Sequence, residues 1–326
     1  MKKIATFIFC ITLTIVTGCA KAPQPKPPIK IAFFTYAGYA HAFIAQEKGY
    51  FEKNGVQVEL VFDKNYAPSK QRYVEGTVDG AFEVYADAIL QNSDGISARV
   101  VYILDYSVSA DAIIGKPEFK DLSGLKGKKI GIDGVNTFSH LFVLAALEKS
   151  GVKEQEVFFV NVSALDVPSA LEKGIIDAGY TWDPIKTALV KNGYKILAEA
   201  QYVPGLLTDV LVFNASMIKK RPQEIKAIVK ALFEAREFVD SNRKEAIKIM
   251  SRPMGMTEAE TEYGLQGIKR LDLKENIKAM QKSTDTTSLF GSGKIIADFY
   301  LKRGQLSRLP DLDKIIEPRF VEELGK

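Results

Sequence analysis

Short apolar patterns typical of strands alternate with helical patterns in this chain, and the same order of strands and helices occurs twice. The first cycle predicts strands over residues 30–35, 56–62 and 79–85 and helices over 40–51, 68–75 and 87–91. The second cycle predicts strands over 129–133, 157–162 and 177–182 and helices over 138–149, 167–173 and 184–191. Such alternation is typical of an α/β fold in which helices cover both faces of a mostly parallel sheet.

Two short motifs favour a duplication. In both cycles a glycine stands three residues before an aspartate, as Gly76 before Asp79 and Gly174 before Asp177. An aromatic residue and an acid then follow at the carboxyl end of a predicted strand, where open α/β sheets bind their ligands. The pairs are Tyr85 with Asp87 and Trp182 with Asp183. Coincidence stays an alternative, because Gly-x-x-Asp is also common where a helix leads into a strand.

The remaining pattern predicts how the two cycles are joined. Extended segments at 100–106, 110–116 and 209–214 precede a helical region that includes the long amphipathic segment 222–241. The simplest topology is a discontinuous first lobe, residues 29–113 and 211–326, and a second lobe, residues 114–210. Two crossover strands would join the lobes, leaving a hinge and a cleft.

The N-terminus reads as a targeting segment. Met1 to Lys3 is positively charged, and the apolar run Ile4 to Thr17 is shorter than the ~20 residues that a membrane-spanning helix needs. Residues 16–19 resemble a bacterial lipobox, so we expect residues 1–18 to be a signal peptide and Cys19 to be lipidated. Residues 19–28 hold four prolines and would form an extended tether. An ordinary signal with an incidental cysteine is the alternative.

The composition limits the chemistry available to the chain that follows the expected signal peptide. Cys10 and Cys19 are the only cysteines, so the rest of the chain has no thiol for catalysis, redox chemistry or a metal site. Loss of residues 1–18 removes Lys2 and Lys3 from 44 basic residues and leaves 42 against 40 acidic ones. This near-neutral body does not favour nucleic-acid binding, and the lipid alone would attach it to a membrane.

Several sequence segments, in their order along the chain, resemble those of a known protein family. They are residues 45–61, 76–81, 105–107 with 110–113, 122–132, 182–184 and 208–212. Together they resemble the periplasmic solute-binding proteins of ABC importers for nitrate, alkanesulfonates, taurine and thiamine pyrimidine precursors. The resemblance implies a type II periplasmic-binding-protein fold, with two α/β lobes joined by two crossover strands around a ligand cleft. It also implies a small-molecule solute and, as partners, an ABC permease and its ATPase.

One branch of that wider family makes the thiamine pyrimidine and depends on a cysteine-rich iron motif, which this sequence lacks. His41 and His140 are the only histidines, so a metal centre lacks ligands as well. We therefore expect a binding protein rather than an enzyme, with no cofactor.

The turn 136–139 is the first candidate for ligand contact. Asn136, Thr137, Phe138 and Ser139 follow a predicted strand and open a helix, whose N–H groups could hold an anion. Simple helix capping is the alternative. Aromatic candidates at loops and strand ends are Tyr36, Tyr39, Tyr85 and Trp182, with His41 beside them as a donor.

Four acids near predicted strand ends or crossovers limit the charge that the solute can carry: Asp87, Asp105, Asp183 and Asp209. A purely anionic solute would be repelled by them unless they are paired or turned away. An amine would gain from both carboxylates and aromatic faces, and a zwitterion could place its anion at the turn 136–139. Helix capping or bracing of the hinge is the alternative role for these acids.

The sequence thus predicts a lipid-anchored, monomeric, extracytoplasmic solute-binding component of an ABC importer, in the periplasm or on the outer face of the cell membrane. Its solute would be a sulfonate- or taurine-like zwitterion, an amine or a pyrimidine precursor. Closure of the lobes around the solute would follow from tighter binding to the closed form. The alternatives are the solute-sensing ectodomain of a membrane sensor and a protein like the thiamine-pyrimidine enzymes.

Overall fold

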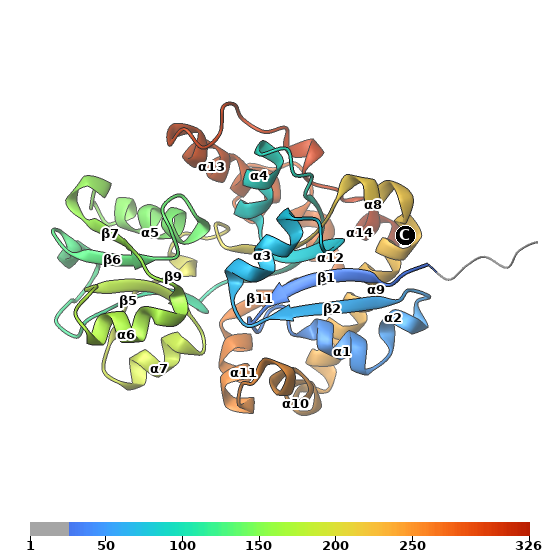
Figure 1. Ribbon diagram of the computed structural model, residues 1–326, viewed down its shortest axis with the longest axis horizontal. Helices are drawn as coiled ribbons and strands as arrows, with labels where there is room; N and C mark the ends of the chain where they lie inside the picture. Colours follow the sequence, from blue (N-terminus) through green and yellow to red (C-terminus); the bar gives the residue numbers. More distant parts are fainter. Residues whose placement is uncertain (1–25) are drawn as a thin grey trace, which may run out of the picture.

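The computed structural model describes residues 26–326. The expected signal peptide, Cys19 and residues 19–25 of the tether lie outside this range. Two β-sheets, each flanked by helices, form two lobes side by side (Figure 1). Within residues 26–326, no helix is both long and apolar enough to cross a membrane.

The first lobe is built on a six-stranded sheet in the order β11-β4-β10-β3-β1-β2. Its strands are β1 (Ile29–Phe34), β2 (Val58–Asp63), β3 (Gly80–Val84), β4 (Arg99–Ser107), β10 (Thr208–Phe213) and β11 (Ile268–Arg270). Strand β1 pairs parallel with β2 and β3, whereas β10 runs antiparallel to both β3 and β4.

The second lobe has a five-stranded sheet in the order β7-β6-β8-β5-β9. Its strands are β5 (Asp111–Gly115), β6 (Lys129–Ile132), β7 (Phe158–Asn161), β8 (Ala178–Trp182) and β9 (Lys195–Glu199). Strand β6 is parallel to β7 and β8, and β5 is antiparallel to β8 and β9. Both sheets are mixed. Most strands of each sheet run in one direction, as expected, but β5 and β10, which directly follow the crossovers, and the edge strand β11 run against their neighbours and supply the antiparallel pairs.

Helices cover these sheets and fill the C-terminal part of the first lobe. In the first lobe they are α1 (His41–Glu47), α2 (Tyr50–Lys53), α3 (Tyr66–Val74), α4 (Tyr85–Ser93), α8 (Ala215–Lys220), α9 (Pro222–Ser241), α10 (Arg243–Met254), α11 (Glu258–Gln266), α12 (Leu273–Ala279), α13 (Leu289–Lys302) and α14 (Arg319–Leu324). In the second lobe they are α5 (Phe138–Lys149), α6 (Val167–Glu172) and α7 (Ile185–Lys191). Residues 268–270, within the region expected to be helical after residue 222, instead form the edge strand β11.

The chain changes lobes twice, over short segments. Residues 108–110 lead from β4 to β5, and the N–H groups of Val108, Ser109 and Ala110 all donate to the carbonyl oxygen of Gly267, at 2.9, 2.8 and 2.9 Å. Residues 200–207 lead back from β9 to β10. Residues 111–113 therefore already pair in the second sheet and 208–210 in the first, three residues from the expected lobe boundaries.

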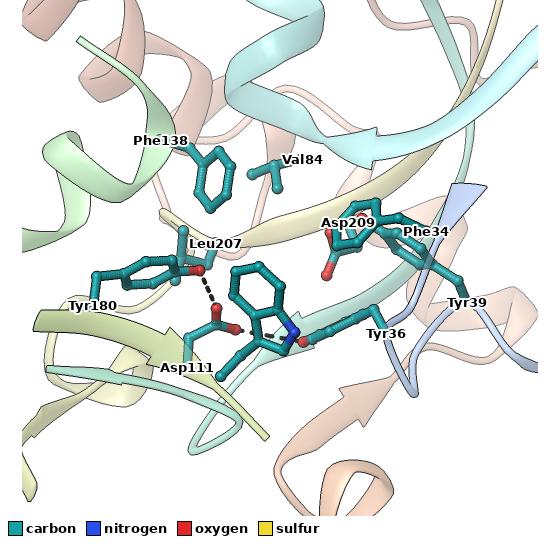
Figure 2. Close-up of a pocket in the computed structure, with 10 residues that line it drawn as sticks. Phe34, Tyr36, Tyr39, Val84, Asp111, Phe138, Tyr180, Leu207 and Asp209 are labelled. Atoms are coloured by element: carbon teal, nitrogen blue, oxygen red, sulfur yellow. Dashed lines mark hydrogen bonds between the residues drawn. The ribbon is translucent and has the colours of Figure 1, made fainter. Parts of the chain in front are cut away.

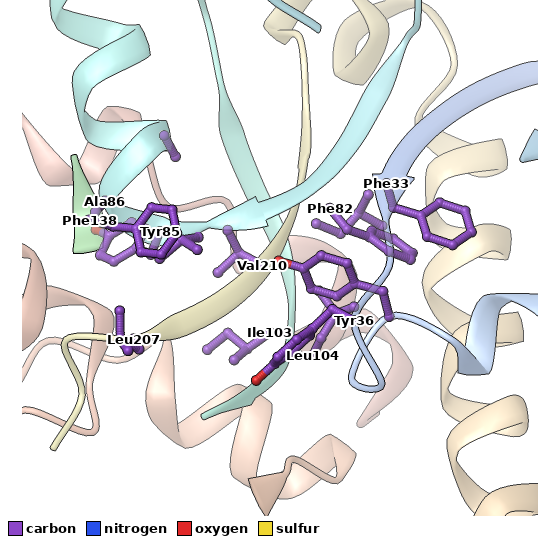
Figure 3. Close-up of a cluster of buried hydrophobic side chains, with 14 of the residues drawn as sticks. Phe33, Tyr36, Phe82, Tyr85, Ala86, Ile103, Leu104, Phe138, Leu207 and Val210 are labelled. Carbon is purple, nitrogen blue, oxygen red and sulfur yellow. The ribbon is translucent and has the colours of Figure 1, made fainter. Parts of the chain in front are cut away.

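One apolar cluster extends from the first sheet to the wall of the second lobe. Figure 3 shows Phe33, Phe82 and Val210 of the first sheet in this cluster, together with Leu207 from the crossover and Phe138 from α5. Rings also meet across the lobes, with Tyr66 and Phe138 centred 5.2 Å apart. The lobes are therefore closed against each other.

Candidate functional site

A pocket lies between the lobes, next to both crossovers (Figure 2). In the closed form its free volume is only about 20 Å³, room for about one water molecule, so a larger solute requires the lobes to move apart. The first lobe contributes Phe34, Tyr36, Tyr39, Val84 and Asp209, and the second contributes Asp111, Phe138, Tyr180 and Trp182, with Leu207 from the crossover. Both lobes therefore supply walls.

Strand ends position these side chains. Phe34 ends β1, Val84 ends β3 and Trp182 ends β8, while Phe138 begins α5 after strand β6. The carboxyl ends of parallel strands open toward the cleft, as in other open α/β sheets. Asp111 pairs with Trp182 across β5 and β8, so a carboxylate and an indole enter the pocket from adjacent strands.

Aromatic rings form most of the wall. Phe34 packs edge-to-face on Tyr39, with ring centroids 5.2 Å apart and planes at 89°, and approaches Trp182 of the other lobe at 6.0 Å. Phe138 packs edge-to-face on Tyr180 at 5.8 Å. Edge-to-face contacts fix ring orientation, so the pocket keeps a defined shape in the closed form.

Asp111 is held by hydroxyl groups from both lobes (Figure 2). Tyr36 of the first lobe donates to its Oδ2 at 3.5 Å, and Tyr180 of the second lobe donates to its Oδ1. Burial raises the pKa of Asp111, although the bond from Tyr180 acts in the opposite direction. The carboxyl group thus links the lobes through two tyrosines.

Asp209 belongs to a second buried acid group. Tyr39 donates to its Oδ1 at 2.5 Å, and its register partner on β4 is Asp105. Burial raises the pKa of Asp209 to about 8, and burial together with Asp209 raises the pKa of Asp105 well above its ordinary value. A proton on Asp105 lets that carboxyl donate to Asp209; without it, neither oxygen of Asp105 has a hydrogen-bond partner within residues 26–326.

The loop between β1 and α1 must pass close to Asp105. A Cβ at Gly38 would lie 2.1 Å from Asp105 Oδ2 and 2.8 Å from the ring of Tyr36. Only a glycine fits there, so the loop that carries Tyr36 and Tyr39 is packed directly on the acid pair.

The described residues that line the pocket include no lysine, arginine or histidine. Lys186 lies nearby but is engaged elsewhere, because its Nζ is 3.0 Å from Asp183 and 3.6 Å from Glu199 and donates to the Ser109 carbonyl. Arg270, on β11, is paired with Asp240. Among the described residues, no cationic side chain therefore lines the pocket, although the charge of Lys186 opposes the rise in the pKa of Asp111.

The polar side chains of the turn 136–139 are engaged in protein contacts, whereas the first N–H groups of α5 have no side-chain cap. The N–H of Asn136 donates to His140 Nδ1 at 2.9 Å, and its Oδ1 accepts from Arg303 of the first lobe at 2.7 Å. Thr137 donates to the Gly134 carbonyl at 2.9 Å, and Ser139 accepts from the N–H of Asp133 at 3.0 Å. Of the four residues, only Phe138 lines the pocket.

His41 and Tyr85 lie outside the pocket, in the core of the first lobe. His41 is buried against the Gly38 carbonyl, with Nδ1 at 2.8 Å, and burial lowers its pKa to about 3. Tyr85 was expected at a strand end but begins α4, where its hydroxyl lies against Gly293 of α13. Its neighbour Val84 lines the pocket instead, so the two aromatic residues of the duplicated motif do not face a common space.

The two acids of that motif also have local partners. Asp87 accepts from Lys70 and from Tyr66, both at 2.6 Å. Asp183 accepts from the N–H of Thr187 at 3.1 Å, at the start of α7, besides its contact with Lys186. These bonds agree with the alternative roles in capping and bracing.

Of the thirteen candidates, the pocket brings together Tyr36, Tyr39, Phe138, Trp182 and Asp209, with Asp105 directly behind Asp209. Sequence reasoning missed Phe34, Val84, Asp111, Tyr180 and Leu207. Period-two alternation could have found Tyr180, which lies two residues before Trp182 on the same strand and so on the same face. Asp111 had no such signal, because its place depends on pairing between β5 and β8.

Comparison with known proteins agrees with this architecture. The family described as "NMT1/THI5 like" matches residues 37–246. The chain belongs to the NMT1/THI5-like family. A protein of Brucella abortus, provisionally named as a binding protein, is 24% identical over 311 residues, 94% of each chain. The family resemblance drawn from the sequence is thus confirmed.

Solved structures confirm the predicted two-lobed α/β fold for this NMT1/THI5-like chain. The ligand-binding component of an ABC-type import system from Staphylococcus aureus, with zinc bound, superposes with a TM-score of 0.75 at 17% identity, covering 91% of this chain and 99% of that one. The periplasmic aliphatic sulphonate binding protein from Escherichia coli gives a TM-score of 0.72 at 16% identity, covering 91% and 100%. At these identities the likeness shows the fold alone.

Proposed function

We propose that this protein is the lipid-anchored, extracytoplasmic solute-binding component of an ABC importer, capturing one small solute in the pocket between its lobes. The observation that carries the proposal is the pocket itself, whose wall is formed by aromatic and acidic side chains from both lobes. A solute that contacts both walls binds the closed form more tightly than the open form. Its binding therefore shifts the population toward closure.

Only two short crossovers would have to change conformation for the lobes to separate. Residues 108–110 form one of them, held to the first lobe by three hydrogen bonds to the carbonyl of Gly267, and residues 200–207 form the other. Small backbone rotations in these short segments would separate the lobes without breaking either sheet.

The names of relatives support the same role. The Brucella abortus relative is named for binding, and the structural neighbours from Staphylococcus aureus and Escherichia coli are named as an importer's ligand-binding component and as a sulphonate-binding protein. In this proposal the monomeric protein, attached through a lipid on Cys19, delivers its solute to a permease driven by an ATPase. A sensing ectodomain with the same pocket is the second candidate for its partner.

Catalysis is a poorer interpretation of the pocket. Among the described residues that line it there is no serine, cysteine, lysine or histidine to form a nucleophile and base pair. A solute should therefore leave the pocket chemically unchanged.

Capture from a small-molecule extract tests the proposal. The purified protein is incubated with extract, washed and denatured, and the released compounds are identified by mass spectrometry. One compound should be recovered unchanged at about one per chain, and Trp182→Ala should lose it, whereas the surface variant Asp313→Asn should retain it. Recovery of a chemically altered product, or of no compound, would refute the binding function.

A further inference from the structure

The charge of the pocket points to its solute. Asp111 and Asp209 both line the pocket, and the described lining residues supply no cation to neutralise them. Lys186, the basic side chain near the crossover, is held by Asp183 and Glu199. Buried carboxylates are normally paired, so a missing partner of positive charge is the simplest complement.

The donors of the pocket are already in use. The hydroxyls of Tyr36 and Tyr180 donate to Asp111, and that of Tyr39 donates to Asp209. In the described part of the chain this leaves the indole N–H of Trp182 as the side-chain donor of the wall without a protein acceptor. A sulfonate, nitrate or carboxylate needs several donors and would meet one, beside two carboxylates.

The side chains of the turn 136–139 do not offer a separate place for an anion. The N–H of Asn136 and the hydroxyls of Thr137 and Ser139 are bonded within the protein, and Phe138 presents its ring to the pocket (Figure 2). A zwitterion would therefore find counter-charges for its ammonium but no free side-chain donor of this turn for its anionic end. The alternative with a single positive charge is favoured.

Aromatic faces suit the same ligand. Rings from both lobes surround the two carboxylates, namely those of Phe34, Tyr36, Tyr39, Phe138, Tyr180 and Trp182. A cation held against such faces is attracted by the negative charge of the π-system, and the attraction grows when water is excluded. The rings and the two carboxyl groups, once ionised by a bound cation, together favour positive charge in the pocket.

We infer that the site takes a small organic cation, an ammonium or a protonated ring nitrogen, with Asp111 and Asp209 as its counter-charges. The inference rests on the proposed function, whose solute it specifies. Burial is the largest cause of the raised pKa of both carboxyls, and at Asp111 the charge of Lys186 opposes it. A bound cation would oppose that shift.

Trp182 is the only tryptophan of the chain, so its fluorescence reports on this pocket directly. The purified protein is titrated with tetramethylammonium and benzylammonium, with the neutral analogue benzyl alcohol, and with benzenesulfonate. The cations should bind, benzylammonium about tenfold or more tightly than benzyl alcohol. Benzenesulfonate should not bind.

Asp111→Asn keeps the shape of the side chain and removes its charge, so it should abolish the preference for benzylammonium over benzyl alcohol. Asp313→Asn is the matched control, because Asp313 is exposed, pairs with Lys282 and does not line the pocket. Thermal melting of both variants checks that they fold. Equal affinity for the cation and its neutral analogue, or an unchanged preference in Asp111→Asn, would overturn the inference.

The same measurements separate this inference from the proposed function. Binding of benzenesulfonate or benzyl alcohol without binding of either cation would overturn the inference that the solute is a cation and leave the proposed solute capture intact. No response to any probe would also overturn that inference. Solute capture itself would fail only if extract also yields no retained compound.

Discussion

Arg303 connects the lobes outside the pocket, and its removal should weaken closure. Its guanidinium, just after α13 in the first lobe, donates to both carboxylate oxygens of Glu154 in the second lobe, at 2.6 Å each. Its Nε donates to Asn136 Oδ1 at 2.7 Å. We call Arg303, Glu154 and Asn136 the interlobe clasp, and we predict that Arg303→Ala shifts the unliganded protein toward the open form.

The size of the effect follows from these contacts. Arg303 and Glu154 side chains are 21% and 35% exposed, so the bidentate pair is worth about 1 kcal/mol rather than the value of a buried pair. The Asn136 bond adds about 0.5–1 kcal/mol. The sum, about 1.5–2 kcal/mol, corresponds to a decrease of about 10- to 30-fold in the closed-to-open ratio.

Two measurements test this, the radius of gyration from X-ray scattering without solute and the apparent solute affinity from Trp182 fluorescence. Arg303→Ala should increase the radius of gyration. It should also weaken solute binding, by up to the same 10- to 30-fold when the open form becomes the major one. High salt should reproduce part of the effect in the unmodified protein.

The control is a pair with the same chemistry inside one lobe. Arg243 donates to both oxygens of Glu262, at 3.0 Å each, with similar exposure and both partners in the first lobe. Arg243→Ala should change stability without changing the radius of gyration or affinity. If Arg303→Ala behaves in the same way, the clasp does not contribute to closure.

Three further changes test other parts of the molecule. Trp182→Ala should abolish the solute-induced rise in melting temperature and also lower the unliganded melting temperature, since the side chain is 5% exposed and packs in the apolar cluster; an unchanged solute-induced rise would remove Trp182 from the site. Glu83, which accepts from Gln91 at 2.7 Å, has its pKa raised to about 8 by burial, so the unfolded chain ionises first and the protein loses stability as pH rises from about 4.5 to 8. Glu83→Gln should therefore gain about 3 kcal/mol relative to the unmodified protein between pH 5.5 and pH 8, by denaturant unfolding, and a pH-independent difference would contradict this. Gly38→Ala should force its Cβ against Asp105, reducing both melting temperature and solute affinity, and an unaltered affinity would show that the loop adapts.

The sequence was sufficient for the two cycles of strands and helices, because each strand and helix has its own local hydrophobic period. The direction of a strand relative to its neighbours in the sheet is not indicated by such a local period. Strand β10 lies between β3 and β4, and β5 lies between β8 and β9, so both sheets are mixed. Such pairing between segments far apart in the chain leaves no mark on the period of either segment.

The same distinction separates the site residues that were predicted from those that were missed. Tyr36, Tyr39 and Trp182 follow directly from strand ends. Asp111 enters the pocket only because β5 pairs with β8. Tyr85 leaves it because β3 ends one residue earlier, and α4 begins two residues earlier, than the pattern indicates. A shift of one residue at a strand end is enough to exchange a pocket residue for a core residue, here Val84 for Tyr85.

The acids of the pocket lie on the strands that join the lobes, and this links charge to movement. Asp111 begins β5 and Asp209 is the second residue of β10, so each carboxylate enters its own sheet directly after a crossover. Opening would separate the two carboxylates, because one moves with each lobe. A cation held between them loses one counter-charge on opening, whereas a neutral solute loses only contact area. The proposed cation would thus have the larger difference in affinity between closed and open forms, and that difference is what drives closure.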